Sequence, residues 1–105
     1  MEPIDIPPYL PGLLDEADAF DLQALCEACS AASDEMLALV HEGVLEPLGS
    51  SAADWRFGAA ALPRARRALR LQHELELDPV GVAVVLDLLD RIEFLQARLR
   101  RLGAL

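Results

Sequence analysis

The residues best suited to chemistry in this sequence are two cysteines and two histidines. Cys26 and Cys29 form a CxxC, and the histidines are His41 and His73. A zinc site needs four such ligands, and no second pair of ligands lies near the first in the sequence. A thioredoxin-like redox motif would need a strand leading into the CxxC helix, and that context is absent. We therefore expect both thiols to be small core residues of a helix, with no metal and no cofactor.

Catalytic groups are equally hard to assemble. Neither histidine is accompanied by an acid-and-nucleophile pattern, and the sequence contains no glycine-rich phosphate loop and no evident pair of carboxylates in a cleft. We therefore expect no enzymatic activity.

One acidic segment has the pattern of a DNA-reading element but the wrong charge. Residues 33–47, SDEMLALVHEGVLEP, have the pattern of the second helix of a helix-turn-helix. The segment contains no lysine or arginine, and its acids are Asp34, Glu35, Glu42 and Glu46. Nucleic-acid binding draws most of its affinity from cations that displace counterions from phosphate. This segment cannot supply those cations.

The uneven distribution of charge extends over the whole chain, whose net charge is −9. Residues 1–55 contain twelve acids and no lysine or arginine, and all nine basic residues are arginines at or after Arg56. An acidic surface repels polynucleotides and speeds encounter with cationic protein surfaces. We therefore expect a basic protein partner and no direct contact with nucleic acid.

Length and hydropathy limit the architecture. The 105 residues suit one domain. A composition of 53% hydrophobic but 5% aromatic residues favours a helical protein rich in Ala, Leu and Val. The longest nearly uncharged apolar run, residues 79–86, is too short to span a membrane. The start of the chain, MEPIDIPPYL, lacks the pattern of a signal peptide, so we expect a cytoplasmic location and no membrane association.

Prolines and helical spacing divide the chain into an N-terminal arm and a folded domain. Residues 1–19 hold four of the seven prolines and are expected to be extended, with an edge strand at residues 4–6. Residues 20–105 form the domain. Its first helix is expected at 22–29 with Asp21 as N-cap. The second is expected at 34–42, with Ser33 as N-cap and Gly43 as its stop.

The remaining elements complete a winged helix-turn-helix. The second helix is expected to bury Met36, Leu37 and Val40. Residues 44–45 and 55–57 are expected to form a short two-stranded wing. The third helix is expected at 59–75, with Pro63 either marking its regular start or distorting its first turn. The fourth is expected at 79–102, with Asp78 as N-cap and Pro79 in the first position.

The last helix has the strongest periodicity of the chain. Its apolar residues recur at spacings of three and four, which defines a heptad seam: Val85, Leu88, Ile92, Leu95, Leu99 and Leu102. A second apolar row, made of Val82, Leu86 and Leu89, lies beside it. One row can pack on the domain while the other faces a partner helix.

The order of three segments resembles a known family. EGVLEP, WRF and RARRALRLQHELELDPVGVAVVLDLLDRIEFL follow one another as in the CbpM-like chaperone modulators, which are related in fold to MerR-type regulators. The resemblance covers about residues 20–102 and leaves out the proline-rich arm. Its most specific residues are Arg70, Leu71, His73, Glu74, Leu75, Leu77, Asp78, Gly81, Ala83, Leu86, Leu88, Asp90 and Ile92.

This resemblance implies a mainly α, MerR-like winged helix-turn-helix with a long C-terminal helix and no catalysis. Members of the family bind the J-domain of a DnaJ-like co-chaperone and keep it from stimulating Hsp70, and the J-domain face that meets Hsp70 is a basic helix. MerR-type proteins dimerise through a C-terminal helix. The seam could therefore join two copies, although it could also pack on its own domain. A MerR-type DNA-binding regulator is the alternative function.

Two acidic faces are candidates for the partner contact, and the sequence leaves both open. One combines Asp87, Asp90 and Phe94 on the fourth helix, an aromatic residue flanked by acids. The other is formed by Glu35 and Glu42 on the second helix. A basic cluster on the third helix could contact phosphate, or acids from the first half of the chain and an Arg70–Glu74 pair could neutralise it. The members of this cluster are Arg64, Arg66, Arg67 and Arg70.

Overall fold

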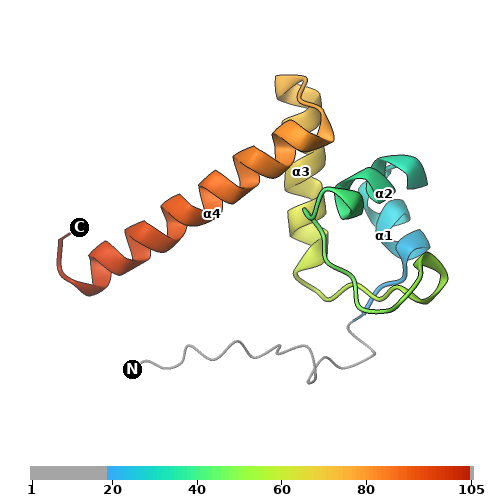
Figure 1. The fold of residues 1–105 in the computed structure, drawn as a ribbon, viewed down its shortest axis with the longest axis horizontal. Helices are drawn as coiled ribbons and strands as arrows, with labels where there is room; N and C mark the ends of the chain where they lie inside the picture. Colours follow the sequence, from blue (N-terminus) through green and yellow to red (C-terminus); the bar gives the residue numbers. More distant parts are fainter. Residues whose placement is uncertain (1–18, 105) are drawn as a thin grey trace.

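The computed structural model describes residues 19–104, which form helices joined by short loops (Figure 1). In chain order these are α1 (Leu22–Cys29), α2 (Ser33–His41), the 3-10 helix η4 (Ala52–Asp54), α3 (Ala61–Leu75) and α4 (Pro79–Arg101). The predicted mainly α class is confirmed. Most of the predicted arm, with its edge strand at residues 4–6, lies outside the described residues.

Helices α1, α2 and α3 pack against one another, and α4 extends away from them along one side (Figure 1). Only the first half of α4 is covered, because Val82 and Leu86 are fully buried whereas its large apolar residues from Ile92 onward are exposed. The predicted division of α4 into a row that packs on the domain and a row that faces outward is therefore confirmed for this part of the helix.

The starts of α1 and α4 follow from their capping residues. Asp21 accepts a hydrogen bond from the Ala24 amide at 2.7 Å, and Asp78 accepts one from the Gly81 amide at 2.8 Å. Each carboxylate satisfies an amide that the first turn of its helix would leave without a partner. Pro79 occupies the first turn of α4, where its missing N–H costs nothing. These predicted caps are confirmed.

The start of α2 differs from the prediction. Ala32 is the N-cap and Ser33 is already helical, while the Glu35 carboxylate reaches back to accept from the Ala32 amide at 3.1 Å. A glutamate at the third helical position can therefore cap the helix without help from a Ser33 hydroxyl. The helix ends at His41, one residue earlier than predicted, with Glu42 as its C-cap. Gly43 follows as the expected stop, and its positive φ of 80° suits glycine.

The predicted buried face of α2 is confirmed at Met36 and is wrong at Leu37, whose place is taken by Leu39. Met36 and Leu39 are fully buried, whereas Leu37 is 39% exposed. Because neighbouring residues on a helix are separated by about 100°, the face that meets α1 and α3 can include Leu39 only by turning Leu37 outward. The expectation for Leu37 was wrong, and Val40 is half-buried beside the core.

The expected wing does not form two strands among the described residues. Its place is taken by two isolated antiparallel bridges, one between Phe20 and Phe57 and one between Leu48 and Arg56. Residues 44–45 are buried in the core and are not a strand, because the Val44 amide donates to the Leu39 carbonyl at 2.9 Å and so continues the helix end. The predicted strand at residues 44–45 was therefore wrong.

Helix α3 begins at Ala61, two residues later than predicted. Pro63 then stands in the first turn, where backbone amides have no partner within the helix, so its missing N–H breaks no hydrogen bond. Of the two alternatives for Pro63, a regular helix that starts close to the proline is therefore the correct one.

The core consists of side chains from all four α-helices and from the segments before and after η4. The buried residues are Leu25, Cys26, Met36, Leu39, Val44, Leu45, Phe57, Ala65, Ala68, Leu69, Val82 and Leu86. Phe57 is the largest of them, and its ring is almost perpendicular to that of Trp55, with the ring centres 6.1 Å apart. Over residues 19–104, the apolar helices are too short or too charged to cross a bilayer.

Candidate protein-binding surfaces

The CxxC cysteines are core residues of α1. Cys26 is buried, Cys29 is half-buried, and both are free thiols. Burial raises the pKa of the Cys26 thiol, and the Cys29, Glu27 and Glu35 side chains raise it further. Burial also raises the pKa of Cys29, although the Arg66 guanidinium opposes the shift. A raised pKa keeps a thiol protonated, and protonated thiols are weak nucleophiles. Within residues 19–104, no group of three His, Cys, Asp or Glu side chains could hold a metal ion.

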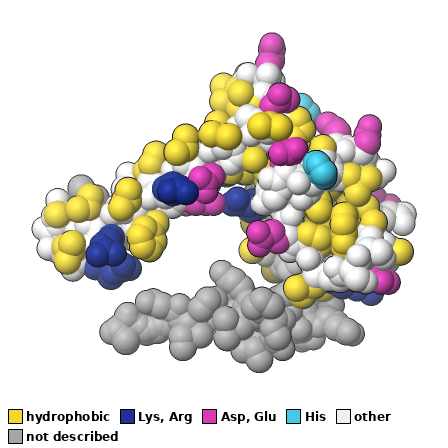
Figure 2. Space-filling model, in the orientation of Figure 1, with side chains coloured by type: hydrophobic (Ala, Val, Ile, Leu, Met, Phe, Trp, Pro, Cys, Tyr) yellow, Lys and Arg dark blue, Asp and Glu magenta, His cyan; other side chains and the backbone are white. Residues whose placement is uncertain are grey.

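Acids and arginines occupy different parts of the surface. In Figure 2 the acidic side chains gather over α2 and over the end where α3 turns into α4, and the arginines lie along α4 with a group near its far end. This end of the molecule carries five acids, Asp34, Glu35, Glu74, Glu76 and Asp78, which we call the hairpin-end surface. A cationic partner would be attracted to this region.

Glu35 joins the two parts of the hairpin-end surface. Besides capping α2, its carboxylate lies 3.6 Å from Nε2 of His73 on α3. Within the described residues, no ion pair links any acid of this surface to an arginine. Exposed apolar side chains accompany the acids, because Leu75 and Val80 are each more than half exposed. The surface therefore offers negative charge together with apolar area.

The acidic face predicted on α4 is occupied by arginines of this chain. Asp87 lies 3.0 Å from Nε of Arg91 one turn further on, and Asp90 lies 3.3 Å from Nη1 of Arg64 on α3. Phe94 is 58% exposed and lines a shallow hollow of about 390 Å³ with Asp90, Arg91 and Leu95. The structure thus brings Phe94 beside Asp90 as expected, but it also places arginines beside both acids.

Glu42, the second acid predicted on α2, lies at the other end of that helix from Glu35. It is the C-cap residue, and its backbone amide donates to the Ala38 carbonyl at 3.0 Å. Glu35 and Glu42 therefore belong to one helix but not to one patch, since α2 is nine residues, about 13 Å, long.

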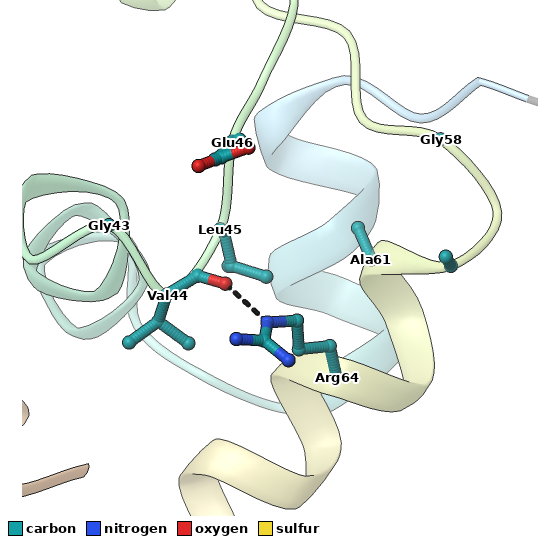
Figure 3. Close-up of a pocket in the computed structure, with 8 residues that line it drawn as sticks. Gly43, Val44, Leu45, Glu46, Gly58, Ala61 and Arg64 are labelled. Atoms are coloured by element: carbon teal, nitrogen blue, oxygen red, sulfur yellow. Dashed lines mark hydrogen bonds between the residues drawn. The ribbon is translucent and has the colours of Figure 1, made fainter. Parts of the chain in front are cut away.

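Arg64 connects three segments of the fold. Its Nε donates to the Val44 carbonyl at 2.6 Å, while its Nη1 faces Asp90. Figure 3 shows this side chain reaching from α3 towards the loop after α2, where it lines a hollow of about 300 Å³ with residues 43–46, 58 and 60–61. Because the guanidinium is already engaged by two partners of its own chain, we assign it a structural role.

The other arginines of α3 are only partly neutralised. Arg67 pairs with Glu93 of α4 at 3.4 Å, and Arg66 approaches the Ala28 carbonyl at 3.5 Å. The sequence suggests acids from the first half of the chain as the neutralising partners. In the structure the neutralising acids come from α4 instead. The predicted Arg70–Glu74 pair is absent from the ion pairs of residues 19–104. Helix α4 packs against α3, which brings Asp90 and Glu93 within reach of Arg64 and Arg67.

Most of the predicted heptad seam is exposed along α4. Val85 is half-buried, whereas five seam residues are between 41% and 73% exposed: Leu88, Ile92, Leu95, Leu99 and Leu102. Sequence reasoning missed that Val80 and Val84, both 54% exposed, continue this stripe towards the start of the helix. Val80, Val84 and Leu88 recur every four residues, and this spacing is the signal that could have revealed the two valines. A stripe of exposed apolar residues of this length is unusual on a solvated helix.

Comparison with known proteins gives consistent results. The family model described as MerR HTH family regulatory protein matches residues 20–103. The chaperone modulatory protein CbpM of Coxiella burnetii (strain Dugway 5J108-111) is 33% identical over 90 residues, which cover 86% of this chain and 85% of that protein.

Two pseudomonad relatives agree with this result. CbpM of Pseudomonas putida (strain GB-1) is 36% identical over 77 residues, which cover 73% of this chain and 76% of that protein. CbpM of Pseudomonas entomophila (strain L48) is 34% identical over 77 residues, with the same two shares. The chain therefore belongs to the MerR helix-turn-helix family and to the CbpM family of chaperone modulatory proteins.

Proposed function

We propose that this chain modulates a chaperone system by binding the J-domain of a DnaJ-like co-chaperone and blocking its stimulation of Hsp70. Two things support the proposal. The relatives carry the name chaperone modulatory protein, and the resemblance described above implies a J-domain partner with a basic docking helix. The single observation that carries it is that, among residues 19–104, no acid of the hairpin-end surface forms an ion pair with an arginine.

The hairpin-end surface fits such a partner better than α4 does. A basic amphipathic helix would meet its carboxylates with cations and its exposed Leu75 and Val80 with apolar side chains. On α4, by contrast, a cationic partner would have to compete with Arg64 for Asp90 and with Arg91 for Asp87. Glu35 is therefore the residue that we place at the centre of the contact, and Glu42, at the other end of α2, lies outside it.

The α4 residues have a secondary part in this proposal. Exposed ion pairs are worth only about 0–1 kcal/mol, so a strongly cationic partner could still displace Arg91 from Asp87. Phe94 would then supply an exposed aromatic anchor beside it. Under this arrangement, replacing Phe94 weakens binding less than replacing the hairpin-end acids.

Titration of the purified chain with the organism's own J-domain protein tests the proposal. We expect binding that weakens as salt rises, because charge attraction is screened. A variant with Asp34→Asn, Glu35→Gln and Glu74→Gln should bind more weakly, whereas the matched variant Glu27→Gln, which neutralises an exposed acid on α1, should bind like the parent. Absence of binding at both low and moderate salt would refute the J-domain assignment.

A second measurement addresses the block itself. Stimulation of the Hsp70 ATPase by the J-domain protein should fall as the chain is added, and the rate of Hsp70 alone should not change. Binding without any loss of stimulation would mean that the chain contacts the co-chaperone away from its Hsp70-docking face.

We also propose that the exposed seam of α4 joins two copies of the chain into a homodimer. Support comes from the run of apolar residues from Leu88 to Leu102, which lack a cover within the described residues. Facing heptad seams bury such rows against each other by knobs-into-holes packing. Pairing would also make two hairpin-end surfaces available in one molecule.

A further inference from the structure

The distal half of α4 carries a second exposed face beside the seam. Arg91, Phe94, Arg98 and Arg101 follow one another at spacings of three, four and three, so they form one stripe, which we call the arginine face. All four side chains are exposed. At 100° per residue the centre of this stripe lies roughly a quarter-turn or more from the centre of the seam formed by Leu88, Ile92, Leu95 and Leu99.

The arginine face combines positive charge with an apolar hollow. Phe94 and Leu95 line the hollow of about 390 Å³ together with Arg91 and Asp90, and the Asp90 carboxylate is paired with Arg64. Arg91 is partly neutralised by Asp87, but among residues 19–104 no ion pair reaches Arg98 or Arg101. An occupant complementary to this face would carry carboxylates together with apolar side chains.

The chain contains one segment of that composition. Residues 1–18 include five acids, no lysine or arginine, and six large apolar or aromatic residues: Ile4, Ile6, Tyr9, Leu10, Leu13 and Leu14. The segment enters the fold at a fixed point, because Phe20 exchanges two backbone hydrogen bonds of 2.8 Å with Phe57.

Length permits this segment to reach the arginine face. Eighteen extended residues span up to about 60 Å, whereas α4, with 23 residues, is about 35 Å long. A tethered segment also acts at an effective concentration of about millimolar, so a contact too weak to form between separate molecules would still be occupied.

We infer that residues 1–18 dock on the arginine face of their own chain, with carboxylates on Arg98 and Arg101 and an apolar side chain in the hollow beside Phe94. This contact does not depend on the proposed function. Apart from Leu95, which lines the hollow, it leaves the seam residues free for a second copy. It also neutralises the positive charge of α4, so that the acidic hairpin-end surface dominates the exterior.

Paramagnetic relaxation on the full chain tests the contact. A nitroxide is attached to a Leu10→Cys variant that also carries Cys29→Ser, and Cys26 is protected by its burial. We expect the amides from Arg91 to Arg101 to lose most of their intensity, while those of α1 keep theirs. The intensity of these amide signals should recover at about 1 M salt, because the Debye length falls to about 3 Å.

Charge variants provide matched controls. Arg98→Gln with Arg101→Gln should recover the intensity, whereas Arg70→Gln, which removes an exposed arginine on α3, should not. Loss at another surface, or no loss at all, would overturn the inference. Broadening that appears only when labelled chains are mixed with unlabelled isotope-enriched chains would also overturn it, because the segment would then dock on a second copy.

Discussion

The guanidinium of Arg64 lies 3.3 Å from the Asp90 carboxylate and so ties α3 to α4. The same side chain donates to the Val44 carbonyl at 2.6 Å. One arginine therefore fixes the loop after α2 and the position of α4 at once. The sequence predicts that Asp90 faces a partner protein. In the structure its carboxylate pairs with Arg64 of the same chain.

Arg64→Ala should lower the free energy of unfolding by about 1–2 kcal/mol, because a charged hydrogen bond to a carbonyl and an ion pair are lost together. Asp90→Asn should cost less than about 1 kcal/mol, since only the ion pair weakens. Urea unfolding followed by circular dichroism measures both. If Asp90→Asn cost more unfolding free energy than Arg64→Ala, the hydrogen bond from Arg64 to the Val44 carbonyl would add no stability beyond the ion pair with Asp90.

Leu39→Ala and Leu37→Ala should differ strongly, although the two leucines are only two positions apart. Leu39 is fully buried, so its truncation should cost about 2–5 kcal/mol in unfolding free energy. Leu37 is 39% exposed, and its truncation should cost well under about 1 kcal/mol. The same urea titration measures both. Equal costs would show that α2 packs in another register.

Local signals in the sequence were sufficient to locate most of the helices. Asp21, Asp78 and Pro79 act within a single turn, so their meaning does not depend on the tertiary structure. The face of α2 could not be obtained in this way. Met36, Leu37, Leu39 and Val40 are all apolar, and only packing against α1 and α3 decides which of them are buried.

The surfaces required information that sequence spacing does not contain. The periodicity of α4 predicted a row that packs and a row that remains outside, but not that Arg64 and Arg67 would reach across to Asp90 and Glu93. Such pairs join residues 26 positions apart and depend on how α4 crosses α3. For the same reason the acidic cluster where α2 meets the α3–α4 turn was only half recognised, through Glu35.

Stability should decline in alkaline solution because of the two thiols. Burial raises the pKa of both Cys26 and Cys29 in the folded chain, so the unfolded thiols ionise first, at about pH 8.5. The contribution of the protonated thiols to the free energy of unfolding is therefore complete below that pH. It is lost as the pH rises through the pKa values that the thiols have in the folded chain. Thermal unfolding in reductant between about pH 8 and pH 10 measures the slope.

Comparison with a thiol-free variant isolates this effect from other groups that titrate in the same range. A Cys26→Ala, Cys29→Ala chain should have a flatter pH dependence, even if its absolute stability is lower. If the parent and the variant lost stability in parallel, the thiols would not be the cause.

A charged residue in the seam should separate the proposed dimer without unfolding the domain. Leu95 and Leu99 are exposed in the single chain, so Leu95→Glu with Leu99→Glu should leave the helical circular dichroism signal unchanged while halving the mass measured by sedimentation equilibrium. Val84→Glu, placed at the edge of the stripe, is the matched control and should have a smaller effect. A parent chain that sediments as a monomer at all concentrations would exclude this role of the seam.

The charge of α2 should decide whether the scaffold binds DNA. We expect no gel shift of duplex fragments by the parent chain at about 50 mM salt, conditions under which electrostatic binding is strong. Asp34→Lys with Glu42→Lys should introduce weak binding without sequence preference that is lost by about 200 mM salt, because each added cation releases counterions from the duplex. The matched variant Asp34→Asn with Glu42→Gln removes the negative charges without adding cations, so it should bind much less. Tight duplex binding by the parent chain would instead favour a MerR-type regulator. It would show that the acidic residues of α2 do not prevent DNA binding.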